Sequence, residues 1–130
     1  MSETSGGAVR PRVPPGWPAA VRPPDAPDWE QDAQSWLLDL CPPDYRAHPV
    51  LLRHPLVLAV LAGHHVRVQV AGQHRAVATL RTDLAGAVPP DVVERTLVAL
   101  EHEQARLMAA ERAVALVEEA LRGRRRAPRL

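Results

Sequence analysis

The 130-residue sequence contains no Phe, Ile, Lys or Asn, and it has few aromatic residues of any kind. Its four aromatic side chains all lie within the first 45 residues: Trp17, Trp29, Trp36 and Tyr45. Any hydrophobic core beyond residue 45 must therefore be built from Leu, Val and Ala. A core of that composition favours helices, and the length suits one small domain.

The chain also lacks the features of exported and membrane proteins. A single cysteine, Cys41, cannot form an internal disulfide or a zinc site with several thiolates. The first residues have no apolar segment of the kind found in signal peptides. The longest apolar run, residues 56–62, is far shorter than the roughly 20 residues of a membrane helix. We therefore expect a soluble cytoplasmic protein with no membrane partner.

Charge is nearly balanced overall but unevenly distributed. The net charge of +1 excludes a bulk nucleic-acid coat protein and an acidic tail protein. Along the chain, however, the net charge is −3 over residues 1–42, +3 over 43–89, −4 over 90–121 and +5 over 122–130. A basic segment folded on an acidic one would benefit from this alternation.

Residues 1–27 hold half of the 14 prolines and few apolar side chains. This composition predicts a disordered or polyproline-II arm. Its only large apolar side chain is Trp17, and the sequence leaves open whether Trp17 packs on the domain or stays in solvent.

A first helix is predicted over residues 28–40. Asp28 is a suitable N-cap, with Gln31 placed to complete a capping box, and Pro42 ends the helix because it disfavours helical geometry at Cys41. Its apolar side chains recur at helical spacing and would anchor it to the domain or, alternatively, contact a partner. The candidate interaction residues here are Trp29, Trp36, Leu37 and Leu40.

Prolines at 43, 49 and 55 divide the next segment into one-turn pieces, and Pro55 is a natural first residue for a longer helix. Residues 65–80 are ambiguous. The alternation of Val66, Val68 and Val70 fits a β-hairpin, whereas Val66, Val70, Val77, Leu80 and Leu84 follow a helical stripe. We favour one helix over about 55–85, with a kink or break near Gly63 as its weakest point.

A final helix is predicted from about Pro90 to residue 121, closed by Gly123. Its apolar side chains recur every seven residues, at Val93, Leu100, Leu107, Val114 and Leu121. Such a seam needs a partner helix. The predicted fold is therefore all-α: a long antiparallel, coiled-coil-like helical hairpin with a short N-terminal amphipathic helix and a disordered Pro-rich arm. In this hairpin Arg81 would lie near Glu94, and Arg75 near Glu101.

The sequence offers little catalytic chemistry. No two of its six histidines are three or four residues apart, the spacing that brings two imidazoles together on one helix face. Only His74 and His102 would meet across the hairpin. Cys41 has no Gly-rich loop or acid–base pair to work with. We expect no catalytic residues, no metal and no cofactor.

Positive charge is concentrated in the Arg-rich C-terminus, residues 122–130. Arg124, Arg125 and Arg126 could bind nucleic-acid phosphates or an acidic partner. They could equally complement the dipole at the end of the helix. A nucleic-acid-associated accessory protein is therefore the alternative functional class.

Two stretches carry a family resemblance: Trp36-Leu37-Leu38-Asp39-Leu40-Cys41-Pro42-Pro43-Asp44-Tyr45-Arg46, followed by His48-Pro49-Val50-Leu51, and residues 115–123 near the end. With these, the sequence resembles a family of small uncharacterised helical proteins from actinomycetes such as streptomycetes. The resemblance implies an intracellular helical protein and no site residues. The leading hypothesis is a non-enzymatic adaptor or regulator that binds a protein partner or self-associates.

Overall fold

The structure is a computed structural model that describes residues 13–126, with side chains placed as far as Gly123. Between residues 13 and 126 it contains helices and no strand, which confirms the prediction of an all-helical fold. In chain order the elements are α2 (Trp29–Asp39), the 3₁₀ helix η1 (Pro43–Ala47), α3 (Pro49–Arg53), α4 (Pro55–Asp83) and α5 (Pro90–Arg126).

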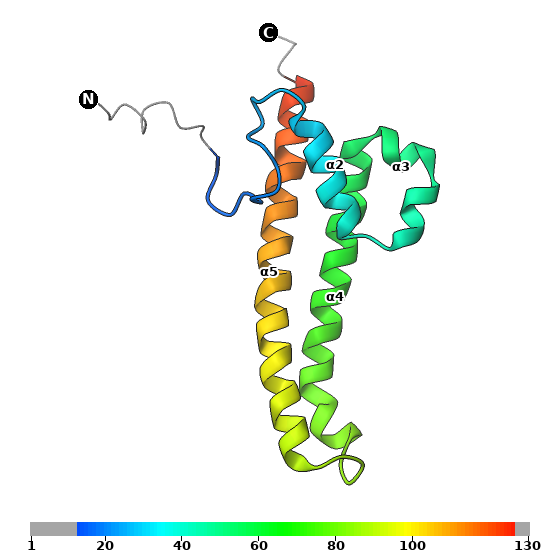
Figure 1. The fold of residues 1–130 in the computed structure, drawn as a ribbon, viewed down its shortest axis with the longest axis vertical. Helices are drawn as coiled ribbons and strands as arrows, with labels where there is room; N and C mark the ends of the chain where they lie inside the picture. Colours follow the sequence, from blue (N-terminus) through cyan, green and yellow to red (C-terminus); the bar gives the residue numbers. More distant parts are fainter. Residues whose placement is uncertain (1–12, 127–130) are drawn as a thin grey trace, which may run out of the picture.

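The two long helices, α4 and α5, lie side by side and run in opposite directions (Figure 1). Pro55 starts α4 as predicted, and the helix continues without interruption through Gly63 and residues 65–80. The favoured helix is therefore confirmed, the β-hairpin alternative is wrong, and the helix is not broken at Gly63, its weakest predicted point. A helix is favoured because a shared apolar stripe can pack on α5, which more than offsets two helical glycines at about 1 kcal/mol each.

A short turn joins the long helices. Asp83 is the last residue of α4, and Gly86 adopts a left-handed conformation with φ 75°. Glycine takes this conformation without the steric penalty of a Cβ atom, so the chain can reverse here. Pro90 then starts α5, as predicted.

Gly123 does not end α5. The helix continues to Arg126, and Gly123 does not have the positive φ that closes a helix at a glycine cap. The first part of the predicted tail, residues 122–126, is therefore a further turn of helix.

The hydrophobic core lies at the end of the long helices remote from the turn, where α2 packs against both of them (Figure 1). Trp29 and Leu37 from α2 meet Leu58 and Ala62 from α4 and Val117 from α5. Each of these side chains is at most 1% exposed. Three helices thus exclude water from this end of the molecule.

Part of the Pro-rich arm belongs to this core. Val21 is buried, and the Trp17 ring packs on the core with its centroid 6.0 Å from that of Trp29. The indole Nε1 of Trp17 donates a hydrogen bond to the Val21 carbonyl oxygen, 2.9 Å away. Residues 17–21 therefore pack on the domain, which answers the question that the sequence left open for Trp17. Residues 1–12 lie outside the described part of the chain.

The predicted capping box at the start of α2 is not formed. Asp28 occupies the N-cap position, but it has a left-handed backbone with φ 63° and its side chain makes no capping hydrogen bond. The first turn is instead closed through the Asp28 carbonyl oxygen, which accepts from the backbone N–H of Gln31 at 3.1 Å.

An ion pair fastens the arm to α2. The Arg22 guanidinium donates to both oxygens of Asp32 at 2.6 and 3.0 Å, and the Arg22 backbone N–H adds a third hydrogen bond at 3.1 Å. The side-chain hydrogen bond from Arg22 is the main cause that lowers the pKa of Asp32. Because the pKa of Asp32 is depressed on folding, the charged carboxylate stabilises the folded state above its unfolded pKa of about 3.8.

The Asp32→Asn variant should accordingly lose less stability in acid than the wild type does. In the wild type the contribution of Asp32 is present at neutral pH and is lost as the pH falls below about 4 toward the folded pKa. We expect the difference between urea midpoints at pH 7 and pH 3 to be smaller in Asp32→Asn than in the wild type. Arg22→Gln removes the other partner and should behave alike; an unchanged difference in both variants would contradict the prediction.

No helix in the described part of the chain combines the length and hydrophobicity needed to cross a membrane.

Candidate interaction surface

Burial is uneven along α4 and α5. Near α2 the two helices contribute a row of fully buried side chains, whereas from residue 67 to residue 106 only Val93 is buried. Two helices alone have no third layer to cover their contact from the side. The half of the pair that adjoins the turn therefore keeps much of its apolar surface in contact with water.

A groove runs along this half between the two helices. It encloses about 370 Å³ and is lined by residues of both helices, namely Val77, Arg81, Glu94, Leu97, Val98, Glu101 and Gln104. We call it the α4–α5 groove. Val98 is 54% exposed and Val77 is 37% exposed. Large exposed aliphatic side chains lining a concavity are typical of a surface that binds another molecule.

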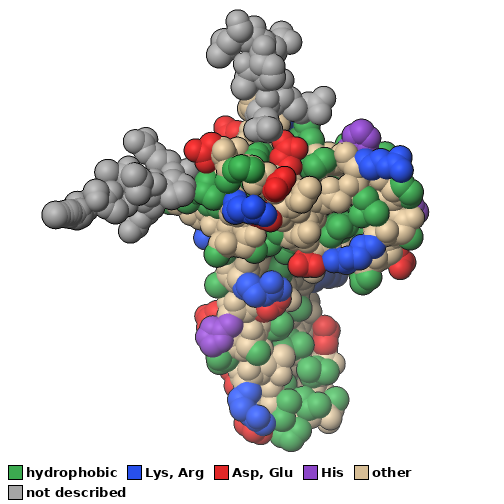
Figure 2. All heavy atoms as spheres, turned by 45° about the horizontal axis from the view of Figure 1, so that its top comes forward, with side chains coloured by type: hydrophobic (Ala, Val, Ile, Leu, Met, Phe, Trp, Pro, Cys, Tyr) green, Lys and Arg blue, Asp and Glu red, His purple; other side chains and the backbone are tan. Residues whose placement is uncertain are grey.

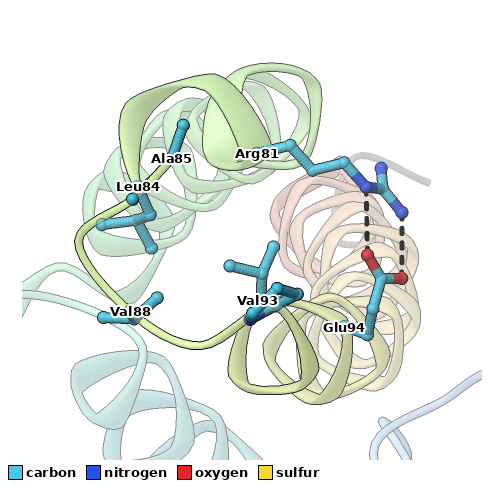
Figure 3. A pocket seen from close by; sticks show the side chains of 8 residues that line it. Arg81, Leu84, Ala85, Val88, Val93 and Glu94 are labelled. Atoms are coloured by element: carbon cyan, nitrogen blue, oxygen red, sulfur yellow. Dashed lines mark hydrogen bonds and ion pairs between the residues drawn. The ribbon is translucent and has the colours of Figure 1, made fainter.

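A second pocket of about 220 Å³ continues the groove toward the turn. Figure 3 shows Leu84, Val88 and Val93 around its open centre, with Arg81 and Glu94 closing one side. Arg81 and Glu94 line both pockets, so the two form one surface about their ion pair. On the face shown in Figure 2, hydrophobic side chains also gather at this end of the molecule.

Charged residues border the groove. Arg81 donates to Glu94 at 3.1 and 3.0 Å, which confirms the first predicted pair. Both side chains are largely exposed, so the pair is worth at most about 1 kcal/mol. The second predicted pair is wrong, since Arg75 makes no ion pair with Glu101 among the described residues. A helix in a coiled-coil-like pair presents the same edge every seven residues. Arg75 is only six residues from Arg81, so it does not share the edge on which Arg81 pairs with Glu94.

Of the predicted interaction residues on α2, Trp29 and Leu37 are enclosed in the core, and Trp36 and Leu40 are half-buried at its edge. The enclosed side chains fix α2 to the long helices and are not accessible to a partner in this structure. Trp36 and Leu40 keep part of their surface free, so a partner contact there stays a prediction.

The predicted basic residues of the tail are only partly described. Arg124, Arg125 and Arg126 form the last turn of α5, and their side chains lie outside the described residues. Just before them, Arg122 donates to Glu118 at 3.0 Å. Binding of phosphates through this tail is thus a prediction that the structure does not test.

The residues that could carry chemistry are not brought together. Cys41 is a free, buried thiol, and burial raises its pKa, which keeps it protonated and weakly nucleophilic at neutral pH. Residues 13–126 contain no group of three or more His, Cys, Asp or Glu side chains able to hold a metal ion. His74 and His102, which could have met across the helices, are part of no such group.

Comparison of the chain with models of protein families, with curated proteins and with solved structures finds no match.

Sequence reasoning did not single out Val77 or Val98 as interaction residues. The sequence carried only a weak signal for them: Val77 belongs to the helical stripe of α4, and Val98 lies two residues before the seam residue Leu100. Their exposure depends on where along the two long helices α2 packs. Periodicity alone cannot supply that information.

Proposed function

We propose that this protein is a non-enzymatic cytoplasmic module for protein–protein interaction, an adaptor or regulator that binds through the α4–α5 groove. The proposal is carried by one observation: Val77 and Val98 lie exposed in a groove between two long helices. Its lining mixes aliphatic side chains with charged and polar ones, so it can receive an amphipathic helix of another protein.

The seven-residue repeat of α5 supports the same proposal. Val93, Leu107, Val114 and Leu121 are buried, and Leu100 is half-buried. We interpret the pair as coiled-coil-like, with the seam facing α4 and the groove beside it. A helix docking in the groove would cover the apolar side chains that α2 leaves uncovered in this half.

A position-specific photo-crosslink tests this function. We would place a benzophenone amino acid at position 98 and express the full chain in its native host. The matched control carries the benzophenone at position 68. Val68 is 69% exposed and lies two and a half helical turns before Val77, hence on the opposite face of α4.

We expect protein adducts at position 98 and few at position 68. Val77→Glu in the same chain should remove the adducts at position 98, because it places a charge in the groove. Deletion of residues 124–130 should leave the adducts unchanged if the groove, and not the Arg-rich tail, makes the contact. Equal adducts at positions 98 and 68, or none at either, would contradict the proposed function.

A further inference from the structure

We infer that the occupant of the α4–α5 groove is a second copy of this chain, so that two chains form a parallel four-helix bundle with their turns at the same end. This inference rests on the proposed function, because it assigns a partner to the same groove.

The groove has the dimensions of a modest dimer interface. The segments next to the turn, residues 67–83 and 90–106, contain one buried side chain, that of Val93, and are each about 25 Å long at 1.5 Å per residue. With two helices of about 10 Å diameter, the face covers on the order of 500 Å². Specific interfaces bury roughly 600 Å² or more on each partner, so the face is close to that minimum. We therefore expect a dimer that dissociates at micromolar concentrations.

Charge complementarity points to a second copy as the partner. On α4, Arg67, His74 and Arg81 recur every seven residues, which places them along one edge of the helix. On α5, Glu94 and Glu101 recur in the same way and line the groove. Each chain thus carries a basic edge on α4 and an acidic edge on α5, and Arg81, Glu94 and Glu101 of these edges line the α4–α5 groove. A surface of this kind is complementary to itself.

The order of the charges selects the orientation of the two copies. If the helices of the two copies are aligned, two faces related by a two-fold axis can meet in two ways. With the axis parallel to the helices, α4 of each copy lies over α5 of the other, and basic and acidic helices alternate around the bundle. With the axis across the helices, α4 lies over α4, which brings like charges together at a cost. The parallel arrangement also sets Arg81 beside Glu94 of the second copy.

Two unpaired groups are consistent with this arrangement: Glu101 in the lining of the groove, and His74 on α4 outside that lining. Glu101 has no hydrogen-bond or ion-pair partner within the described part of the chain, and neither has the ring of His74. Glu101 and His74 are each seven residues from a member of the Arg81–Glu94 pair, on the side away from the turn. In the parallel bundle these two residues lie two helical turns further from the turn than Arg81 and Glu94. There His74 of one copy faces Glu101 of the other.

Sedimentation equilibrium of the full chain between about 1 and 500 µM tests the dimer. We expect a monomer–dimer equilibrium that Val98→Glu weakens at least tenfold, because the charge would be buried in the interface. Val68→Glu is the matched control on the opposite face and should dissociate like the wild type. Circular dichroism should show that both variants retain the helicity of the wild type, since both valines are exposed in the single chain.

A charge-exchange experiment tests the orientation. Arg81→Glu and Glu94→Arg each place like charges at the same level of a parallel bundle, so each variant should dimerise at least fivefold more weakly than the wild type. An equimolar mixture of the two should recover a dimer, because opposite charges then meet between the copies. The Arg81–Glu94 pair within each chain stays broken, so recovery reports contacts between chains. Two impaired variants that fail to recover on mixing would overturn the parallel arrangement.

The outcomes separate this inference from the proposed function. A wild-type chain that stays monomeric up to 500 µM overturns the dimer. If the crosslinker at position 98 then captures a different protein and the one at position 68 does not, the interaction function holds with another partner. A dimer equally stable in Val98→Glu would show that the copies meet through a different surface and would also overturn the inference.

Discussion

Replacing Trp29 by alanine is expected to lower the free energy of unfolding by about 3 to 5 kcal/mol. Trp29 is 1% exposed and lies where α2, the arm and the long helices meet. Its ring also packs on Trp17, so the variant would remove an aromatic contact in addition to buried surface. The measurement is urea unfolding followed by far-ultraviolet circular dichroism, because tryptophan fluorescence would itself change in the variant.

Two variants serve as comparisons. Trp36 has the same side chain on the same helix but is only half-buried, and Trp36→Ala should cost less than half as much as Trp29→Ala. The indole Nε1 of Trp29 is buried without a hydrogen-bond partner among the described residues. Trp29→Phe removes that unpaired donor along with part of the ring, so it should also cost less than Trp29→Ala. A loss below about 1 kcal/mol for Trp29→Ala would mean that α2 is not held by this side chain.

Introducing a carboxylate at Ala62 is expected to be comparably damaging. Ala62 is fully buried in α4 within the core. The described side chains contain no buried polar or charged partner for a new charge. An unpaired buried charge costs about 3 to 5 kcal/mol, so Ala62→Glu should separate the three helices at room temperature or leave them marginally stable.

Ala109→Glu is the matched control, since Ala109 is an exposed alanine in the other long helix. It should change the free energy of unfolding by less than about 0.5 kcal/mol. Lowering the pH toward 4 should reduce the penalty of Ala62→Glu relative to that of Ala109→Glu, because a protonated carboxyl group is less costly to bury. Equal penalties at neutral pH would show that α2 does not close the core over Ala62.

Local sequence patterns predicted the starts of the helices well, because proline and turn signals lie immediately before them. The prolines at 55 and 90 start the long helices, and Gly86 reverses the chain between them. The ambiguous segment 65–80 became helical because its apolar stripe meets the seam of α5. The single glycine at 123 did not end a helix, since a glycine stops a helix only where the backbone turns left-handed.

The candidate surface was harder to predict than the helices. The heptad positions of α5 identified the side facing α4, and Arg81 and Glu94 set the register. Which end of the pair would be covered depended on α2, whose apolar face was also a candidate to bind a partner. Once Trp29 and Leu37 pack into the core, the interaction surface moves to the uncovered groove near the turn.

The sequence has no Phe or Ile, and every aromatic residue lies before residue 46. This composition determined that tryptophan would stabilise one end of the molecule, and that Leu, Val and Ala would stabilise the rest. The sequence alone also determined where the long helices start and the opposite charges of their segments, because capping signals and charge are local properties. Only the tertiary structure decided that Trp17 packs on the core and that the groove of Val77 and Val98 stays open. Those outcomes depend on which distant side chains compete for the same apolar face, and packing settles that competition across the whole chain.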